Sequence, residues 1–170
     1  NTKTGTIEKI VNGGKRLLRA EDGIVFLDSG LPGEEVLFEI QQKQKGTRYG
    51  RLLEIHKESP WRQKSDCDIF PACGGCNLLE ATQENRRQIK TEMLQDVLQR
   101  MGKWDAGLLE KVKELRYEEN NQGRIRATLH VDEAGHFGFF GRQSHDVISL
   151  EQCVALHPFL QAFITELQEH

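Results

Sequence analysis

Between residues 5 and 56, apolar and polar side chains alternate over short stretches that are separated by turns. Alternation with a period of two places every second side chain on one face, which is typical of half-buried β-strands. The turn Leu31-Pro32-Gly33-Glu34 has proline and glycine at the two positions that a type II turn favours. Five short strands in about 50 residues predict a small closed barrel. The strands are expected at residues 5–11, 16–19, 24–27, 36–41 and 49–55, of which 24–27 is a short continuous apolar run.

The apolar period becomes helical in the following segment, where Ile89, Met93, Val97 and Met101 lie four residues apart. This spacing places them on one face of a helix over residues 83–101, which ends at a glycine. Alternation then returns, and a second helical pattern closes the chain. The later strands are expected at residues 124–131, 136–142 and 146–150, and the last helix at residues 157–167.

These elements predict an α+β fold with two domains. Residues 1–57 would form an N-terminal five-stranded, OB-like barrel, and residues 58–170 a small α+β domain. Within the second domain, strand alternation places Ala127, Leu129 and Val131 on one face. We expect that face to pack on the helix 83–101.

Three of the four cysteines, Cys67, Cys73 and Cys76, lie on one short loop, and Cys153 follows the last predicted strand. The adjacent Gly74-Gly75 gives this loop the backbone freedom to turn its thiolates toward one point. Four thiolates are the ligand set of an iron–sulfur cluster or of a structural zinc ion. The three-plus-one distribution fits a [4Fe–4S] cluster better, with zinc as the main alternative and four unligated thiols as another.

The chain is 37% hydrophobic and 29% charged, which is typical of a globular protein. No apolar run approaches the roughly 18 residues of a membrane span, and no signal peptide is recognisable. We therefore expect a cytoplasmic protein with no membrane partner, whose cysteines bind metal and form no disulfides. Residues 1–57 carry 10 Lys and Arg against 8 Asp and Glu, whereas residues 58–170 carry 13 against 18. Nucleic-acid binding would depend on local basic patches.

The barrel region resembles a TRAM domain, a small OB-like barrel that binds RNA. The resemblance rests on residues 7–14, 22–27 and 31–36. A small barrel without any ligand is the alternative for this region.

The whole chain resembles the N-terminal half of the RNA (uracil-5-)-methyltransferases that modify 23S ribosomal RNA. The matching segments are the motif Cys67-x5-Cys73-Gly74-Gly75-Cys76, the helix that ends at residues 101–102, the strand 124–131, and residues 138–148 leading to Cys153. In that family a TRAM domain precedes a central domain with a [4Fe–4S] cluster. A further Rossmann-like domain binds S-adenosylmethionine and carries the cysteine that attacks uracil.

The resemblance assigns Cys67, Cys73, Cys76 and Cys153 to the cluster, which leaves no catalytic residue in this chain. No glycine-rich motif for a methyl donor is present. We therefore expect a monomeric, RNA-recognising segment of a methyltransferase that does not transfer methyl groups alone, with 23S ribosomal RNA favoured over transfer RNA. A stand-alone RNA-binding adaptor and a small electron-transfer protein are the alternatives.

Basic side chains supply the expected contacts with RNA phosphates. Arg124 and Arg126 lie two residues apart, so they share one face of the predicted sheet. Plain solvation, or pairing with Glu118, Glu119 or Asp146, is the alternative for that face. The full set of predicted RNA contacts is Lys15, Arg16, Arg48, Arg124, Arg126 and Arg142.

Overall fold

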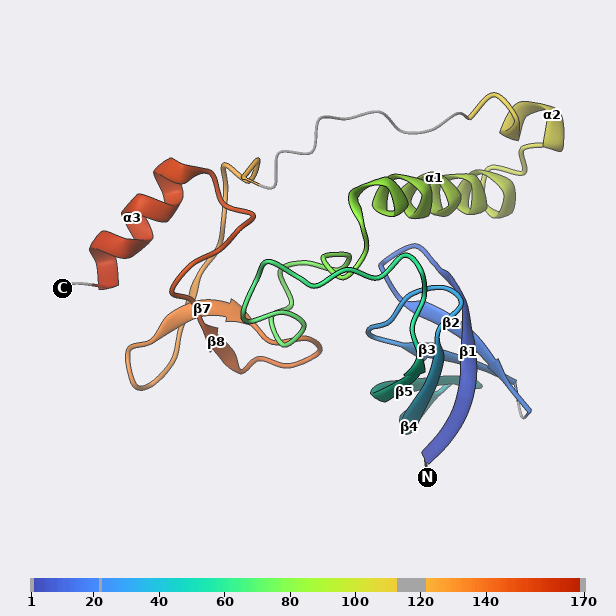
Figure 1. Ribbon diagram of the computed structural model, residues 1–170, viewed down its shortest axis with the longest axis horizontal. Helices are drawn as coiled ribbons and strands as arrows, with labels where there is room; N and C mark the ends of the chain where they lie inside the picture. Colours follow the sequence, from blue (N-terminus) through green and yellow to red (C-terminus); the bar gives the residue numbers. More distant parts are fainter. Residues whose placement is uncertain (1, 22, 113–121, 169–170) are drawn as a thin grey trace. The chain divides into compact units, whose positions relative to one another are not determined.

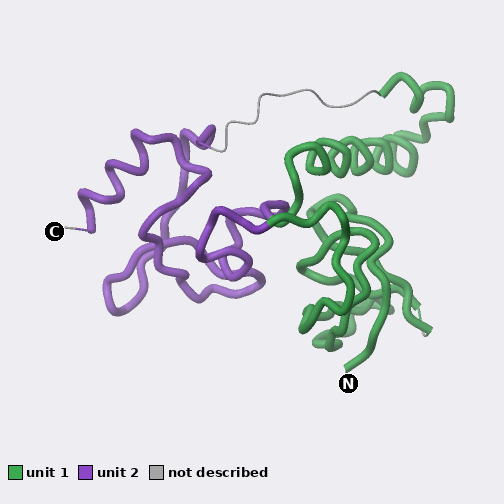
Figure 2. Tube along the Cα trace, in the orientation of Figure 1, with its two compact units in different colours: residues 1–63, 80–116 green, residues 64–79, 117–170 purple. Residues whose placement is uncertain are grey.

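The computed structural model describes residues 2–21, 23–112 and 122–168, and the chain divides into two compact units (Figures 1 and 2). Unit 1 comprises residues 1–63 and 80–116, and unit 2 comprises residues 64–79 and 117–170. The helix predicted at residues 83–101 therefore belongs to the unit that contains the barrel. The division into residues 1–57 and 58–170, as a statement about independently folding domains, stays a prediction.

Unit 1 contains the predicted barrel of five strands, which closes in the order β1-β2-β3-β5-β4 (Figure 1). All neighbouring strands are antiparallel except β3 and β5, which run parallel. Closure leaves the barrel without an unpaired edge. The strands are β1 (Thr2–Ile10), β2 (Arg16–Ala20), β3 (Gly23–Leu27), β4 (Glu35–Gln44) and β5 (Thr47–Lys57).

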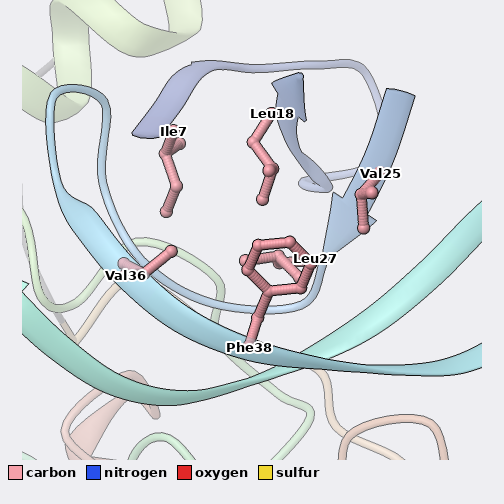
Figure 3. Close-up of a cluster of buried hydrophobic side chains, with 6 residues drawn as sticks. All are labelled: Ile7, Leu18, Val25, Leu27, Val36 and Phe38. Atoms are coloured by element: carbon pink, nitrogen blue, oxygen red, sulfur yellow. The ribbon is translucent and has the colours of Figure 1, made fainter. Parts of the chain in front are cut away.

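The alternating apolar residues fill the barrel, as the sequence pattern predicted. Figure 3 shows their side chains directed toward one another. They belong to β1, β2, β3 and β4. The turn before β4 also has its predicted form, because Gly33 has a φ of +84° and the Glu34 N–H donates to the Leu31 carbonyl at 3.2 Å. The buried core residues are Ile7, Leu18, Val25, Leu27, Val36 and Phe38.

Two carboxylates buried in unit 1 bind arginine side chains. Glu34 accepts hydrogen bonds from the Arg62 Nε and Nη2 at 2.5 and 2.8 Å, and from the backbone N–H of Leu31 at 2.9 Å. Glu80 pairs with Arg16, whose Nη2 lies 2.7 Å from its Oε1. The hydrogen bond with Glu34 raises the pKa of the Arg62 guanidinium above its ordinary value. These pairs attach the segments around residues 62 and 80 to the barrel.

Helix α1 (Gln83–Arg100) is capped at its N-terminus by Thr82, whose hydroxyl accepts a hydrogen bond from the Asn85 N–H at 3.4 Å. Its predicted apolar face is buried only in part, because Ile89 is buried whereas Met101 is 77% exposed. Polar contacts join the helix to β1, where Lys9 lies 2.6 Å from Asp96. A short helix, α2 (Ala106–Leu109), was not predicted from the sequence.

Unit 2 contains a three-stranded sheet in the order β6-β7-β8, followed by α3 (Pro158–Gln168) (Figure 1). The strands are β6 (His130–Val131), β7 (Phe137–Phe140) and β8 (Val147–Ser149). No helix among the described residues is long and apolar enough to cross a membrane.

The predicted strand over residues 124–131 is wrong for most of its length. Arg124 pairs instead with the turn before α3, through its N–H to the Ala155 carbonyl and its carbonyl to the His157 N–H, both at 2.9 Å. The packing expected on helix 83–101 is wrong as well. Ala127 and Leu129 pack in a separate core of unit 2, and Val131 is 68% exposed. The core of unit 2 contains Cys73, Phe139, Leu150, Leu156 and Ile164.

The buried pair in unit 1 predicts a large difference between two arginine substitutions. Arg16→Met leaves Glu80 buried without its counter-charge, which should lower the free energy of unfolding by about 3–5 kcal/mol. Arg19→Met removes an exposed pair with Glu8 and should cost no more than about 1 kcal/mol. Urea unfolding of both variants measures the difference, and equal losses would contradict this account of the buried pair.

Candidate metal centre

The four cysteines all belong to unit 2, and each is a free thiol. Cys67, Cys73 and Cys76 lie on a loop of successive turns, in which the Cys73 N–H donates to the Ile69 carbonyl at 3.0 Å. Cys153 lies just before α3, and the Gln161 Oε1 accepts its N–H at 2.9 Å. The backbone N–H groups of Cys73, in the loop, and of Cys153, before α3, are thus both hydrogen-bonded.

Backbone hydrogen bonds hold the cysteine loop against the end of β7. The Gly74 N–H donates to the Phe140 carbonyl at 2.9 Å, and the Arg142 N–H donates to the Ala72 carbonyl at 3.0 Å. A Cβ atom on residue 74 would lie only 2.9 Å from that Phe140 oxygen. Glycine is therefore required at position 74 for the loop to approach the strand this closely.

Two arginine side chains fix the carbonyl groups of the same loop. Arg142 donates from Nε to the Pro71 carbonyl at 2.6 Å and from Nη2 to the Cys76 carbonyl, and its guanidinium lies over the Phe70 ring. Arg124 donates from Nη2 to the Gly75 carbonyl at 2.8 Å. A planar guanidinium can bind several acceptors at once, which suits it to holding an irregular loop.

Two of the four thiols, those of Cys73 and Cys76, have a pKa above the ordinary value. Burial raises the pKa of the Cys73 thiol, and charge on Cys67 or Cys153 raises it further. Burial also raises the pKa of Cys76, with contributions from the other three cysteines, while Arg124 opposes the rise in both. Like charges at close range disfavour ionisation, so a bound cation would offset the repulsion between thiolates.

The residues fit a sulfur-ligated group in their chemistry. Cys73 is part of the core of unit 2 and Cys153 packs against the same core. The Gly75 N–H also donates to the Cys73 sulfur at 3.3 Å, a contact of the kind that tunes iron–sulfur clusters. Within the described ranges, however, no group of three or more His, Cys, Asp or Glu side chains is placed to hold a metal ion. Metal binding itself therefore remains a proposal.

The structure corrects the predicted RNA contact at Arg16, because this side chain is fully buried against Glu80 and cannot reach a ligand in solution. Arg124 and Arg142 turn toward the cysteine loop, and their distances to its carbonyls show a role that the sequence pattern did not indicate. A local pattern cannot distinguish an arginine that binds backbone carbonyls from one that binds phosphates.

Three of the predicted RNA-contacting residues are at least partly exposed to solvent. Arg126 is exposed, and Lys15 and Arg48 are half-buried on the barrel. Among the acidic partners considered for the arginines, Asp146 accepts the Ser144 hydroxyl at 3.0 Å. Glu118 and Glu119 lie outside the described residues.

Comparison with known proteins relates the chain to RNA methyltransferases, although no family model matches it. It is 30% identical over 148 residues to an uncharacterized RNA methyltransferase of Bacillus cereus, covering 86% of this chain and 32% of the relative. It is 29% identical over 157 residues to the 23S rRNA (uracil(1939)-C(5))-methyltransferase RlmD of Methylococcus capsulatus, covering 91% and 35%. The chain thus spans about a third of the length of the curated relatives it matches.

A solved structure shares the fold. It is the tRNA (uracil-54, C5)-methyltransferase of Pyrococcus abyssi in complex with S-adenosyl-L-homocysteine, with a TM-score of 0.64 and 19% identity. The match covers 98% of this chain and 36% of that one. RNA uracil-5 methyltransferases are therefore homologous to most of this chain, and its closed five-stranded barrel fits a TRAM-like domain.

Cys73 is buried, and the contacts of Arg142 with the cysteine loop predict how well this loop protects its thiol from alkylation. Arg142→Met removes charge-assisted hydrogen bonds that are each worth about 1.5–3 kcal/mol, so the loop should open at least about tenfold more often. Alkylation of Cys73 by iodoacetamide in metal-free protein, followed by mass spectrometry, should accelerate accordingly. The exposed Arg126→Met is the matched control, and equal rates in the two variants would show that Arg142 does not hold the loop.

Proposed function

We propose that this chain is the RNA-recognition and iron–sulfur portion of an S-adenosylmethionine-dependent RNA (uracil-5-)-methyltransferase. The observation that carries the proposal is the similarity to RNA methyltransferases over 86–96% of the chain, together with the closed barrel. Since the chain spans about a third of those relatives, methyl-donor binding and methyl transfer are assigned to other parts of the protein. Cytoplasmic location and a monomeric state belong to the same proposal.

The favoured RNA in this proposal is 23S ribosomal RNA. Curated relatives named for 23S rRNA reach 29–30% identity, compared with 19% for the solved enzyme named for tRNA. Arg126 is the best-supported phosphate contact, since it is exposed and belongs to a segment whose alternate residues pack in the core of unit 2. Lys15 and Arg48 are proposed contacts on the barrel.

Cys67, Cys73, Cys76 and Cys153 are the proposed ligands of one [4Fe–4S] cluster. The packing of Cys73 and Cys153 in one core and the N–H···S contact at Cys73 support this assignment. When bound, the cluster would supply covalent cross-links between the loop and Cys153, in the segment before α3. Metal–thiolate bonds of this kind stabilise small units whose apolar core is limited.

The cluster proposal predicts the metal content of the chain. Protein purified without oxygen should be brown and contain iron and inorganic sulfide in equal amounts, with the Mössbauer spectrum of a cubane. Cys153→Ser removes one ligand and should lower the iron retained after gel filtration. A colourless anaerobic protein with stoichiometric zinc would replace the cluster by a zinc site, and an anaerobic protein without metal would exclude both.

The RNA proposal predicts binding that weakens with salt. Arg126→Ala should reduce the affinity for a 23S ribosomal RNA fragment and lower the slope of log affinity against log salt by about 0.7–0.9, the effect of one lost phosphate contact. Lys57→Ala removes the same charge from an exposed pair with Glu35 and serves as the control.

Affinity and salt slope can be measured by fluorescence anisotropy at several salt concentrations. The same slope in the Arg126→Ala variant and in the unmodified chain would remove Arg126 from the interface. Absence of RNA binding by the unmodified chain would refute the proposed function itself.

A further inference from the structure

Three aromatic rings gather on the hairpin sheet of unit 2. The rings of His130 and Phe140 are stacked, with centroids 3.5 Å apart and planes inclined by only 13°. His145 meets Phe140 edge-on at 5.2 Å and 77°. The edge-on contact is a favourable arrangement for an aromatic pair, and the stacked pair places one ring directly over the other. The cluster lies outside the cysteine centre and was not singled out from the sequence.

Strand register places this stack on the face of the sheet that points away from the core. His130 is paired with Gly138, and Phe140 with Val147. Side chains alternate between the two faces, so Phe139 and Ile148 lie on the opposite side, where they pack in the core of unit 2. His130 and Phe140 are half-buried and His145 is exposed, so the cluster remains in contact with solvent.

We propose that His130, stacked on Phe140, forms a platform on which one unpaired RNA base stacks. This inference rests on the proposed function and names a contact within it. An aromatic face that is reachable from solvent binds bases of any identity, because every base has a π-face. Stacking on aromatic side chains is also the common way in which proteins hold unpaired bases of RNA.

The proposed phosphate contact Arg126 lies next to this platform along the chain. In the segment leading to β6, Ala127 and Leu129 pack in the core, whereas Arg126 and Thr128 are exposed. Arg126 and His130 thus flank Thr128 at alternate, solvent-facing positions. A cation beside a stacking surface is the combination that binds a single strand through its backbone and its base together.

The test uses the full chain and a single-stranded uridine dodecamer with one central 2-aminopurine, whose fluorescence falls when it stacks. Binding to the unmodified chain should quench this fluorescence. His130→Gln removes the ring and keeps a polar side chain of similar reach. It should weaken binding about 5- to 100-fold and abolish the quenching, as expected for one lost stacked base.

The salt dependence of RNA affinity should be the same in His130→Gln as in the unmodified chain, because no phosphate contact is lost. His130→Trp restores an aromatic face and should recover both affinity and quenching. The matched control is His136→Ala, since His136 lies in the same hairpin but pairs with Asp132 through Nδ1 at 3.1 Å. Thermal unfolding of each variant verifies that it is folded.

Two results would overturn the platform while leaving RNA recognition intact. One is a folded His130→Gln variant that binds the RNA with the same affinity and the same quenching as the unmodified chain. The other is a loss of binding that His130→Trp does not restore, since a stacked base accepts any large aromatic ring. Failure of the unmodified chain to bind RNA at all would overturn the platform and the proposed function together.

Discussion

Arginine side chains that turn inward hold the irregular parts of this protein. Arg16 and Arg62 bind buried glutamates in unit 1, and Arg124 and Arg142 bind loop carbonyls in unit 2. A buried charge is strongly unfavourable unless it is paired and fully hydrogen-bonded. Arg16 and Arg62 meet the buried glutamates with charge-assisted hydrogen bonds, and Arg142 contacts two carbonyls of the cysteine loop. The segments that supply these acceptors can then adopt few other conformations.

The two units differ in how much their structure depends on these arginine side chains. The barrel closes around six fully buried apolar residues, so its arginines attach surrounding segments to a core that hydrophobic burial already stabilises. Unit 2 has a three-stranded sheet and a smaller buried cluster, of which Cys73 is itself a member. Its cysteine loop therefore depends on hydrogen bonds to β7 and on Arg124 and Arg142, and metal–thiolate bonds would add to a framework that is otherwise polar.

The sequence predicted the parts of the fold that follow local periodicity. Short alternating stretches and the continuous apolar run at residues 24–27 located the five barrel strands, and Pro32-Gly33 located the turn before β4. It failed where a distant partner decides the outcome. Residues 124–129 alternate like a strand, yet Arg124 pairs with the backbone before α3. Arg16 looks like a surface cation, yet Glu80, 64 residues away in sequence, buries it. No local pattern contains such pairings.

Phe140 connects the cysteine loop with the aromatic stack on the sheet. Its carbonyl accepts the Gly74 N–H, while its ring stacks with His130 on the face away from the core. Metal bonds to the three thiolates of this loop would thereby fix the end of β7 and, with it, the Phe140 ring that stacks with His130. The proposed metal centre would influence RNA affinity through geometry alone, because a preorganised stacking surface loses less conformational entropy when a base binds. Electron transfer is not required for such a centre to matter for recognition.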